Sequence, residues 1–530
     1  MTTSPNPPLA QPEASYDGVL PDGSRLHRHS DVRRDNTGYD RQSASLRWDH
    51  AIGGNALVKT VLTASNIDQD TAGSSTISRD DYYNNPTINY TPISYRKVQA
   101  LRLSSAYEQE DGARLVSVTP YVRYDSMDLL ANWALSYDPT VYNTQNKSFG
   151  VLAKVRQDFA PMRARVIGGV DIDYSPGGRD ENVIAVGTEG SGYTKRYTSY
   201  VVGDKVFDYD ASFRAISPYL HGELSPLDVL RLTAGLRYDH MSYQYDNNLS
   251  DGVANSGGRF FYRPADTDVS YQHWSPKLGA TYDLGAQQNV FAAYNHAFRA
   301  PSEGQLFRPS SAGSAANLVR NTTDLKPVKV NSYELGYRGQ QGRDLSYSLS
   351  AYRMEKRDDI LSYKDPVTNA TQSVNAGRTL HRGAEAGVNA RLMPALELGV
   401  SYGYAIHTYE EWQLNATTNY NGKEMETAPR QIGNTRLTYA PAGDKGWRAT
   451  AEWVHLGSYW LDQANTQKYN GHDLLNLRGN APLAKQWSMF ASLANVTDRR
   501  YAESASLSSG NDVYAPGMPR TLYLGLEYKN

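Results

Sequence analysis

The segments QNVFAAYNHAFRAPSEGQLFRP (residues 288–309) and NTTDLKPVKVNSYELGYRG (residues 321–339) decide the fold, with a polar Ser/Ala/Asn run between them. Two strand-like runs flank a connection of about thirty residues, far longer than the usual turn. In the return run, Tyr333, Leu335 and Tyr337 alternate with Ser332, Glu334, Gly336 and Arg338. This two-residue period predicts a strand with one face on apolar material and the other on a polar medium.

The composition favours a boundary between oil and water. The chain has 40 Tyr, only 10 Phe and no Cys. Tyr combines an apolar ring with a polar tip, which suits such a boundary. The lack of Cys fits the oxidising bacterial envelope. The formal net charge of -2 argues against a nucleic-acid partner held by bulk electrostatics.

The sequence predicts no transmembrane helix. Its mean hydropathy is -0.61, and it has no apolar run of about eighteen residues. The N-terminal stretch MTTSPNPPLAQPEASYDGVL lacks a basic region followed by an apolar one, so it is not a secretory signal. We therefore expect either a mature chain or one without its N-terminal portion.

Two regimes divide the chain. Residues 1–40 are rich in Pro, Ser, Asp and Arg without periodicity, which predicts an irregular N-terminal segment. From 41 to 530, alternating runs come in close pairs, giving about nineteen strands. The predicted strands are 42–49, 56–66, 97–108, 113–124, 147–158, 162–174, 211–223, 228–240, 273–284, 288–297, 331–340, 344–354, 380–392, 395–407, 431–440, 447–456, 471–481, 485–494 and 520–528.

The strand lengths and connections favour a membrane barrel. Runs of about nine to thirteen residues match strands that cross a bilayer at a tilt, whereas soluble sandwiches favour about five or six. Short and long connections alternate strictly, so all long ones lie on one side, as in outer-membrane barrels. The sequence therefore predicts an all-β, antiparallel transmembrane β-barrel. The alternative is a soluble repeat such as a propeller, which would show a fixed period that this sequence lacks.

The strand count carries a further expectation. Bacterial single-chain barrels have an even number of strands and begin and end on the periplasmic side. Counting back from 520–528 makes 42–49 a descending strand, so at least one strand must precede it. Either 1–40 contains that strand, or an N-terminal portion is missing.

Several strings resemble the TonB-dependent outer-membrane receptors, especially the ferric-siderophore group. They are AFRAP at 297–301, LKP at 325–327 followed by SYELG at 332–336, RGAE at 382–385, NVTDRRY at 495–501 and PGMPR at 516–520. The resemblance implies a barrel of about 22 strands around an N-terminal plug, with a short box that contacts TonB. The plug, the box and about three strands are not recognisable here, and Tyr528, two residues from the end, replaces the family's terminal aromatic residue.

Arginine and aromatic residues in the predicted loops are the candidate ligand contacts. Arginine pairs with carboxylates through a planar fork, and aromatic rings stack on flat chelates. The alternative is that these residues support the loops or form the interfacial aromatic belt. The candidates are Arg196, Tyr197, Arg259, Phe260, Phe261, Tyr262, Arg263, Phe307, Arg308, Arg320 and Trp412.

The resemblance implies TonB-dependent uptake of a ferric siderophore across the bacterial outer membrane. The ferric siderophore and the membrane lipid would be partners, and TonB would be one only if a plug and box exist upstream. We expect no permanently bound cofactor, no metal site and no enzyme, because no nucleotide, zinc or nucleophile motif is present.

Three other functions stay open. A haem receptor would need an axial His, but none lies between Pro301 and Leu325, and His296 precedes that stretch. A passive pore or a barrel fragment without transport function would show a large constant conductance. A surface docking site for macromolecules would use the long loops.

Overall fold

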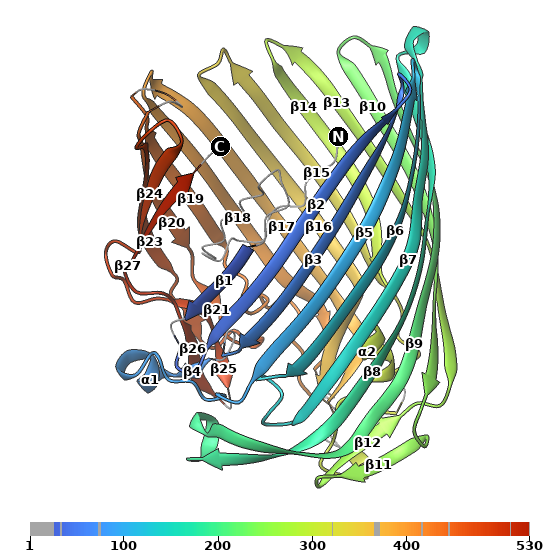
Figure 1. Ribbon diagram of the computed structural model, residues 1–530, viewed down its shortest axis with the longest axis vertical. Helices are drawn as coiled ribbons and strands as arrows, with labels where there is room; N and C mark the ends of the chain where they lie inside the picture. The colour runs from blue at the N-terminus through green and yellow to red at the C-terminus, as the bar shows by residue number, and fades with distance from the viewer. Residues whose placement is uncertain are drawn as a thin grey trace.

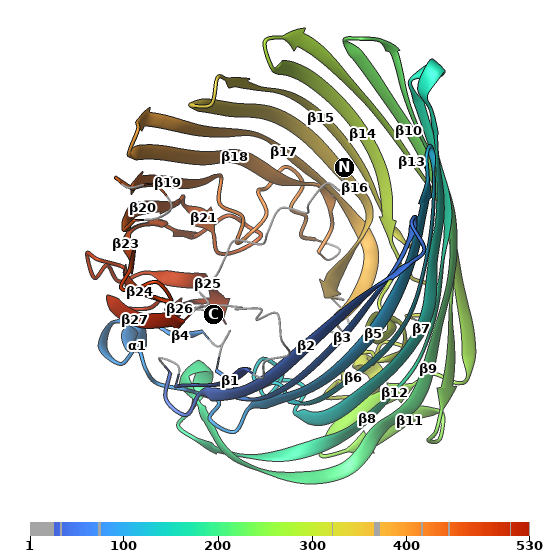
Figure 2. The same cartoon turned by 45° about the horizontal axis from the view of Figure 1, so that its top comes forward.

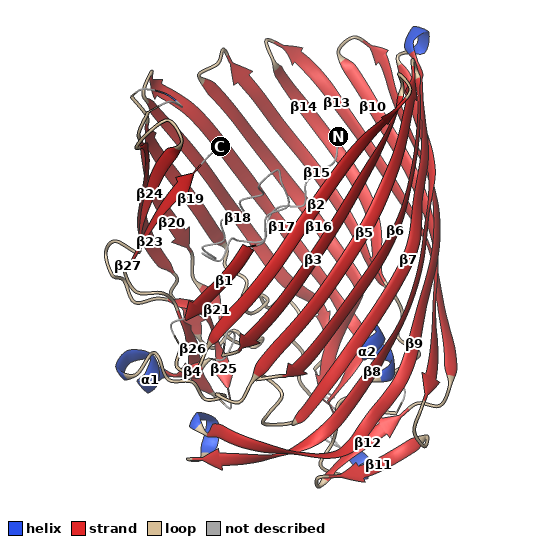
Figure 3. Cartoon of the chain, viewed as in Figure 1, coloured by secondary structure: helices blue, strands red, loops and turns tan. Residues whose placement is uncertain are grey.

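The computed structural model describes residues 26–31, 34–72, 76–320, 322–364, 371–414, 417–441, 443, 446–508 and 510–528. Long antiparallel strands dominate it (Figure 3). In this described part of the chain, no helix has the length and apolar character needed to cross a membrane.

One 20-stranded antiparallel sheet curls around a central space (Figure 1). Each strand pairs with the next main strand along the chain, as alternation with tight turns predicts. Its strands are β1 (Leu26–Asp31), β2 (Gly38–Ile52), β3 (Ala56–Asp70), β5 (Tyr95–Asp111), β6 (Arg114–Leu130), β7 (Thr140–Phe159), β8 (Ala164–Glu189), β9 (Arg196–Leu227), β10 (Leu230–Asn247), β13 (Thr267–Gly285), β14 (Gln288–Arg299), β15 (Val328–Gln341), β16 (Leu345–Lys364), β17 (Thr371–Met393), β18 (Leu396–Trp412), β19 (Gln431–Tyr439), β20 (Arg448–Leu456), β23 (His472–Pro482), β24 (Trp487–Ala494) and β27 (Thr521–Tyr528).

The remaining elements lie in the connections between main strands. They are β4 (Ile77–Ser78), α1 (Arg79–Asn84), η1 (Ala160–Met162), η2 (Gly192–Thr194), β11 (Gly252–Ser256), β12 (Arg259–Arg263), α2 (Glu303–Phe307), η3 (Ala315–Asn317), β21 (Tyr459–Trp460), β22 (Lys468–Tyr469), β25 (Ala502–Ser508) and β26 (Asn511–Pro516). Most of the long connections gather at the lower end in Figure 1, and the short turns at the upper end.

All the predicted strands are confirmed, and the sheet contains one more. The prediction of an irregular segment over 1–40 is wrong for Leu26–Asp31, which forms β1, and for the start of β2 at Gly38. β1 pairs antiparallel with β2, from Leu26 opposite Ser43 to Asp31 opposite Gly38. It supplies the preceding strand that the even count requires.

The outer face of the sheet is apolar. On β27, Leu522, Leu524 and Leu526 are 60–68% exposed, so three leucines face outward at two-residue spacing. In water this surface would be costly, whereas in lipid it is the expected one. Exposed aromatic side chains flank this apolar band toward both strand ends. They include Tyr282, Trp447, Trp487 and Tyr528 near the turns, and Trp274, Tyr333 and Tyr404 toward the loops.

The two edges of the sheet are joined through loops. Among the described residues, β1 pairs only with β2 and β27 only with β24, which leaves an opening between them (Figure 2). β4, from the β3–β5 connection, pairs with β26, from the β24–β27 connection. Buried Ile77 packs there with Tyr82, Tyr90, Tyr459 and Ala505. We call this assembly the loop clasp.

We expect Ile77→Ala to loosen the loop clasp by about 2–5 kcal/mol, the usual cost of removing a buried isoleucine side chain. Ile77 is fully buried. Hydrogen exchange in β25 and β26 should rise while exchange in β13–β16 stays unchanged. Ile52→Ala, at an exposed position, is the control. Equal exchange in the two variants would contradict a clasp that depends on this side chain.

Candidate functional site

The β14–β15 connection folds onto the wall of the barrel. Its short helix α2 begins after Ser302, which forms a capping box with Gln305: the Gln305 backbone N–H donates to the Ser302 hydroxyl, and the Ser302 N–H donates to the Gln305 side chain. The helix places Leu306 and Phe307, both fully buried, into a cluster with β9, β10 and β12. Thr322 donates a hydrogen bond to the Leu306 carbonyl and ties the returning chain to the helix.

Aromatic rings hold this connection, which we call the anchored loop (300–327). The ring of Phe307 stacks on Tyr245 with centroids 4.6 Å apart. Phe261, also fully buried, meets Phe207 edge-on at 5.9 Å. Of the predicted ligand contacts, Phe261 and Phe307 thus face the core under the loop, and their ligand binding stays a prediction.

Arg308 lies in a buried cluster of charges. Its guanidinium donates to both carboxylate oxygens of Glu181 on β8 and to Asp138 in the β6–β7 connection. Arg179 donates to the same Glu181 at 2.6 Å, and its guanidinium lies 3.8 Å from the Tyr142 ring centroid. Burial alone would raise the pKa of Glu181, but the Arg308 and Arg179 guanidinium groups hold that pKa at about 2.

The β12 arginines also have protein partners. Arg259 donates from Nε to the Ser311 hydroxyl at 2.7 Å. Arg263 is buried and donates from Nε to the Val206 carbonyl at 2.9 Å. Burial lowers the pKa of Arg263 below its usual range. Phe260 exchanges two backbone hydrogen bonds with Ala312, so the β11–β12 hairpin is bonded to the outer part of the anchored loop. The neighbouring Tyr262 is half-buried.

The other predicted contacts lie elsewhere. Arg320 is exposed, and its guanidinium donates weakly to the Ala315 carbonyl at 3.4 Å. Arg196 and Tyr197 begin β9, where the Tyr197 backbone N–H donates to the Tyr90 carbonyl at 2.8 Å. Trp412 ends β18, is 1% exposed and donates from Nε1 to Gln463 at 3.1 Å. The structure therefore brings only residues of 259–263, Phe307 and Arg308 into one assembly.

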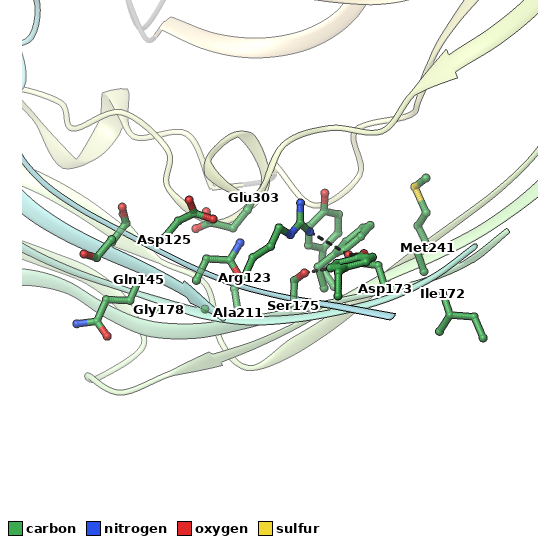
Figure 4. A pocket seen from close by; sticks show the side chains of 18 of the residues that line it. Arg123, Asp125, Gln145, Ile172, Asp173, Ser175, Gly178, Ala211, Met241 and Glu303 are labelled. Atoms are coloured by element: carbon green, nitrogen blue, oxygen red, sulfur yellow. Dashed lines mark hydrogen bonds and ion pairs between the residues drawn. The ribbon is translucent and has the colours of Figure 1, made fainter. Parts of the chain in front are cut away.

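A cavity of about 690 Å³ lies against the wall beside the anchored loop, and Glu303 of α2 closes one side of it (Figure 4). Its wall comes from β5 to β10. Its polar lining includes Tyr121, Arg123, Asp125, Gln145, Asp171, Asp173, Ser175, Tyr209, Arg237 and Tyr243.

Most charges in the cavity are already paired. Arg123 donates to Asp173 at 3.0 Å, and Arg237 donates to Asp171 at 2.5 Å. Tyr209 donates to Glu303 and thereby joins the wall to the anchored loop. Asp125 has only a 3.3 Å contact from Arg102. Carboxylates outnumber guanidinium groups along this lining, so the charge of the cavity has a negative balance, while apolar side chains such as Phe213 and Met241 line the rest.

Sequence reasoning missed these cavity residues because it searched the loops. The sequence does contain a signal for them. Every second residue of a strand faces the inside of the barrel, and residues of opposite charge occur at these inward positions at similar distances from the short turns. Arg102 on β5 and Asp125 on β6 are one such pair, and Asp171 on β8 meets Arg237 one strand further on, on β10. Depth along each strand can be counted from the short turns once the alternation is known.

His296 is occupied by neighbouring side chains. Its Nε2 lies 2.8 Å from Nε2 of His273, and its Nδ1 lies 2.8 Å from the Asn331 side-chain oxygen. Both ring nitrogens of His296 thus have protein partners, and a haem-ligating role for it stays a prediction.

Comparison with known proteins places the chain in a family. Residues 4–496 match the family described as TonB dependent receptor-like, beta-barrel. The catecholate siderophore receptor Fiu of Escherichia coli K12 is 26% identical over 55% of this chain and 39% of its own length. An iron-regulated outer membrane virulence protein of Vibrio cholerae is 25% identical over 34% of this chain and 28% of its own length.

Solved structures share the fold. The ferric citrate transporter FecA superposes with a TM-score of 0.74 at 18% identity, over 93% of this chain and 71% of FecA. The siderophore receptor PiuA from Acinetobacter baumannii superposes with a TM-score of 0.73 at 14% identity, over 96% of this chain and 76% of PiuA. The chain matches less than half the length of the curated relatives named above.

The family match, the strand pattern and the apolar outer face agree with one another. The predicted membrane barrel and its place in the bacterial outer membrane are confirmed. The chain belongs to the TonB-dependent receptor family, whose β-barrel it matches over residues 4–496.

Proposed function

We propose that this chain takes up a ferric siderophore across the outer membrane, with energy from TonB. The observation that carries the proposal is the cavity beside the anchored loop. Its volume of about 690 Å³ is in the range of small-molecule sites. Tyr121 and Tyr243 give it ring surface for stacking, and its lining combines apolar side chains such as Phe213 with charged ones. The printed names of the relatives, which include a catecholate siderophore receptor, point the same way.

The charge of the cavity narrows the kind of siderophore. Asp125, Asp171, Asp173 and Glu303 line it, and Arg123 and Arg237 are engaged by two of those carboxylates. A highly anionic chelate would meet net repulsion there. We propose that a neutral ferric complex, such as a trihydroxamate, binds better than a triply charged catecholate complex.

Binding to the purified chain tests both statements. Quenching of tyrosine and tryptophan fluorescence should report saturable binding of a neutral ferric trihydroxamate, and weaker binding of a ferric tricatecholate. Iron-55 uptake into cells that depend on this receptor is the matching transport measurement. Absence of binding by either complex, together with a large constant conductance in planar bilayers, would favour a passive pore.

Asp125→Asn should change the charge preference without changing the shape. It removes one negative charge from the lining, so we expect the affinity for the tricatecholate complex to rise several-fold, since Coulomb repulsion acts at short range there. The affinity for the neutral complex should stay within a factor of about two. Asp49→Asn, in the exposed pair with Arg47, is the matched control. A similar response of both complexes to Asp125→Asn would contradict an electrostatic role for the cavity.

A further inference from the structure

Four sulfur and imidazole side chains stand in one line across three strands and a loop. Met354 on β16 is the register partner of His381 on β17, and His381 is the register partner of His407 on β18. Met425 continues the line, because its backbone N–H donates to the His407 carbonyl at 2.9 Å. The neighbouring bridge between Thr408 and Glu424 fixes this register. We call Met354, His381, His407 and Met425 the Met/His row.

The Met/His row faces the inside of the barrel. Directly paired residues of antiparallel strands share a face, and that face alternates along each strand. Leu349 on β16 and Tyr402 and Tyr404 on β18 are exposed on the outer, lipid-facing side of the sheet. Met354 is an odd number of residues from Leu349, and His407 an odd number from Tyr404, so both side chains point to the other side. The line therefore lies on the inner face, and His381 in it is buried.

The two imidazole rings already touch. Nδ1 of His381 lies 2.8 Å from Nδ1 of His407, and the ring centroids are 5.0 Å apart. A hydrogen bond between two ring nitrogens needs one lone pair, so at least one ring is neutral. Nε2 of His381 contacts the Thr379 hydroxyl at 3.1 Å. Among the described residues, Nε2 of His407 has no hydrogen-bond partner.

The composition of the row selects a soft cation. Thioether sulfur favours Cu(I), whereas imidazole serves several late first-row metals. The row itself has no carboxylate, and the nearby Glu424 is already paired with Arg430. Lys356 stands one row away, opposite Thr379, and its ammonium group repels a divalent cation twice as strongly as a monovalent one.

We propose that Met354, His381, His407 and Met425 bind one Cu(I) ion on the inner face of the barrel. The two imidazoles give up their mutual hydrogen bond and each supplies one nitrogen, while a methionine sulfur approaches from either side. The described residues contain no group of three or more His, Cys, Asp or Glu side chains arranged for a metal. The site is independent of siderophore uptake, since no residue of the row lines the cavity.

The chain carries its own control. His273 and His296 also form a histidine pair, with Nε2 atoms 2.8 Å apart and ring centroids 4.9 Å apart. Its neighbours are Phe298, at 4.4 Å between ring centroids, and Asn331. These groups contain no sulfur. The two pairs differ in two respects: methionines flank His381 and His407, whereas the buried carboxylate of Asp239, held by Arg237, lies opposite His273. The methionines carry the proposed selectivity for Cu(I).

The test is titration of the purified full chain in detergent with Cu(I), under ascorbate and against a chromogenic Cu(I) chelator. We expect one equivalent to bind, at least tenfold weaker binding in M354L/M425L, and no binding in H381Q/H407Q. H273Q/H296Q should bind like the unchanged chain. X-ray absorption should show sulfur next to copper in the unchanged chain and not in M354L/M425L.

Two outcomes would overturn the proposal. One is undiminished Cu(I) binding in M354L/M425L, and the other is an equal loss in H273Q/H296Q. Heat-modifiable migration on gels shows whether each variant is folded. If H381Q/H407Q fails to fold, M354L/M425L alone decides, because exchange of Met for Leu conserves volume. Siderophore binding by M354L/M425L should stay unchanged, which separates failure of this site from failure of the transport proposal.

Discussion

Arg308→Met is expected to release the anchored loop from the barrel wall. Arg308 is the cation between Glu181, which is fully buried, and Asp138, which is nearly so. Breaking a buried ion pair by removing one partner costs about 3–5 kcal/mol, because the other charge stays buried without compensation. Arg179 still faces Glu181, whereas Asp138 loses its bond from Arg308. Limited proteolysis should cut within 300–327 at least tenfold faster, while the strands stay protected.

Two companion variants make this prediction specific. Arg320→Met changes an exposed arginine of the same loop whose contact is a 3.4 Å bond to a carbonyl, and proteolysis should stay unchanged. Asp138→Asn in the Arg308→Met background removes the carboxylate that has lost its guanidinium partner and should restore part of the protection. Equal cleavage of the Arg308→Met and Arg320→Met variants would show that the charge cluster does not hold the loop.

Acid should act in the same direction as Arg308→Met. The pKa of Glu181 is about 2 in the folded chain, against an ordinary value of 4.5. A depressed carboxyl pKa stabilises the folded state fully above the ordinary pKa, and that contribution is lost as the pH falls from about 4.5 toward 2. Protection of 300–327 in the unchanged chain should therefore decline over this interval. The Arg308→Met variant should show a smaller pH dependence, because of the two guanidinium groups only that of Arg179 then lowers the pKa of Glu181.

The sequence predicted the strands well because lipid on one face and polar contents on the other impose strict alternation. The outward leucines of β27 are the clearest case. β1 was missed because LHRHSD contains one aliphatic residue and no alternation. Its place depends on pairing with β2, a tertiary effect. The loop clasp also depends on tertiary pairing and could not be predicted from the sequence, because it joins connections more than 400 residues apart.

The candidate site was harder to predict than the fold. Phe261 and Phe307 carry the composition of a ligand contact, yet their rings are buried beneath the anchored loop. Composition does not distinguish a loop aromatic that packs on the wall from one that faces a ligand. Arg308 poses the same problem, because a guanidinium suited to an anionic chelate is equally suited to two carboxylates of the protein. Only the fold brings Glu181 and Asp138 to it.

Glycines on the inner face are another feature that the sequence predicts only in part. The alternation predicts that Gly336 and Gly525 lie on the polar, inward face of their strands, but it does not explain why these residues are glycine. In the structure, an aromatic ring of the neighbouring strand lies over each one: Phe291 over Gly336 and Phe490 over Gly525. The same arrangement joins Tyr121 to Gly150 and Tyr219 to Gly169. Each pair needs the strand register, which the sequence alone does not provide.

Gly525→Val is expected to impair assembly of the last strand. A Cβ atom at position 525 would lie 2.1 Å from Cε1 of Phe490, its register partner on β24. Overpacking of this kind usually costs about 1–3 kcal/mol. Because β24 is the only described strand that pairs with β27, the cost falls on the single ladder that holds the C-terminal strand. We expect less folded, heat-modifiable barrel in the outer membrane and more protein in the insoluble fraction.

The compensating change tests the physical cause. Phe490→Ala removes the ring that the new side chain would meet, so Gly525→Val in that background should assemble better than Gly525→Val alone. Phe490→Ala by itself should cost less than the clash, because it leaves the backbone ladder between β24 and β27 intact. A double variant that assembles worse than either single variant would mean that the β-branched residue strains the backbone of β27 directly. Glycine at position 525 would then be needed for the backbone conformation of β27 and not to make room for the Phe490 ring.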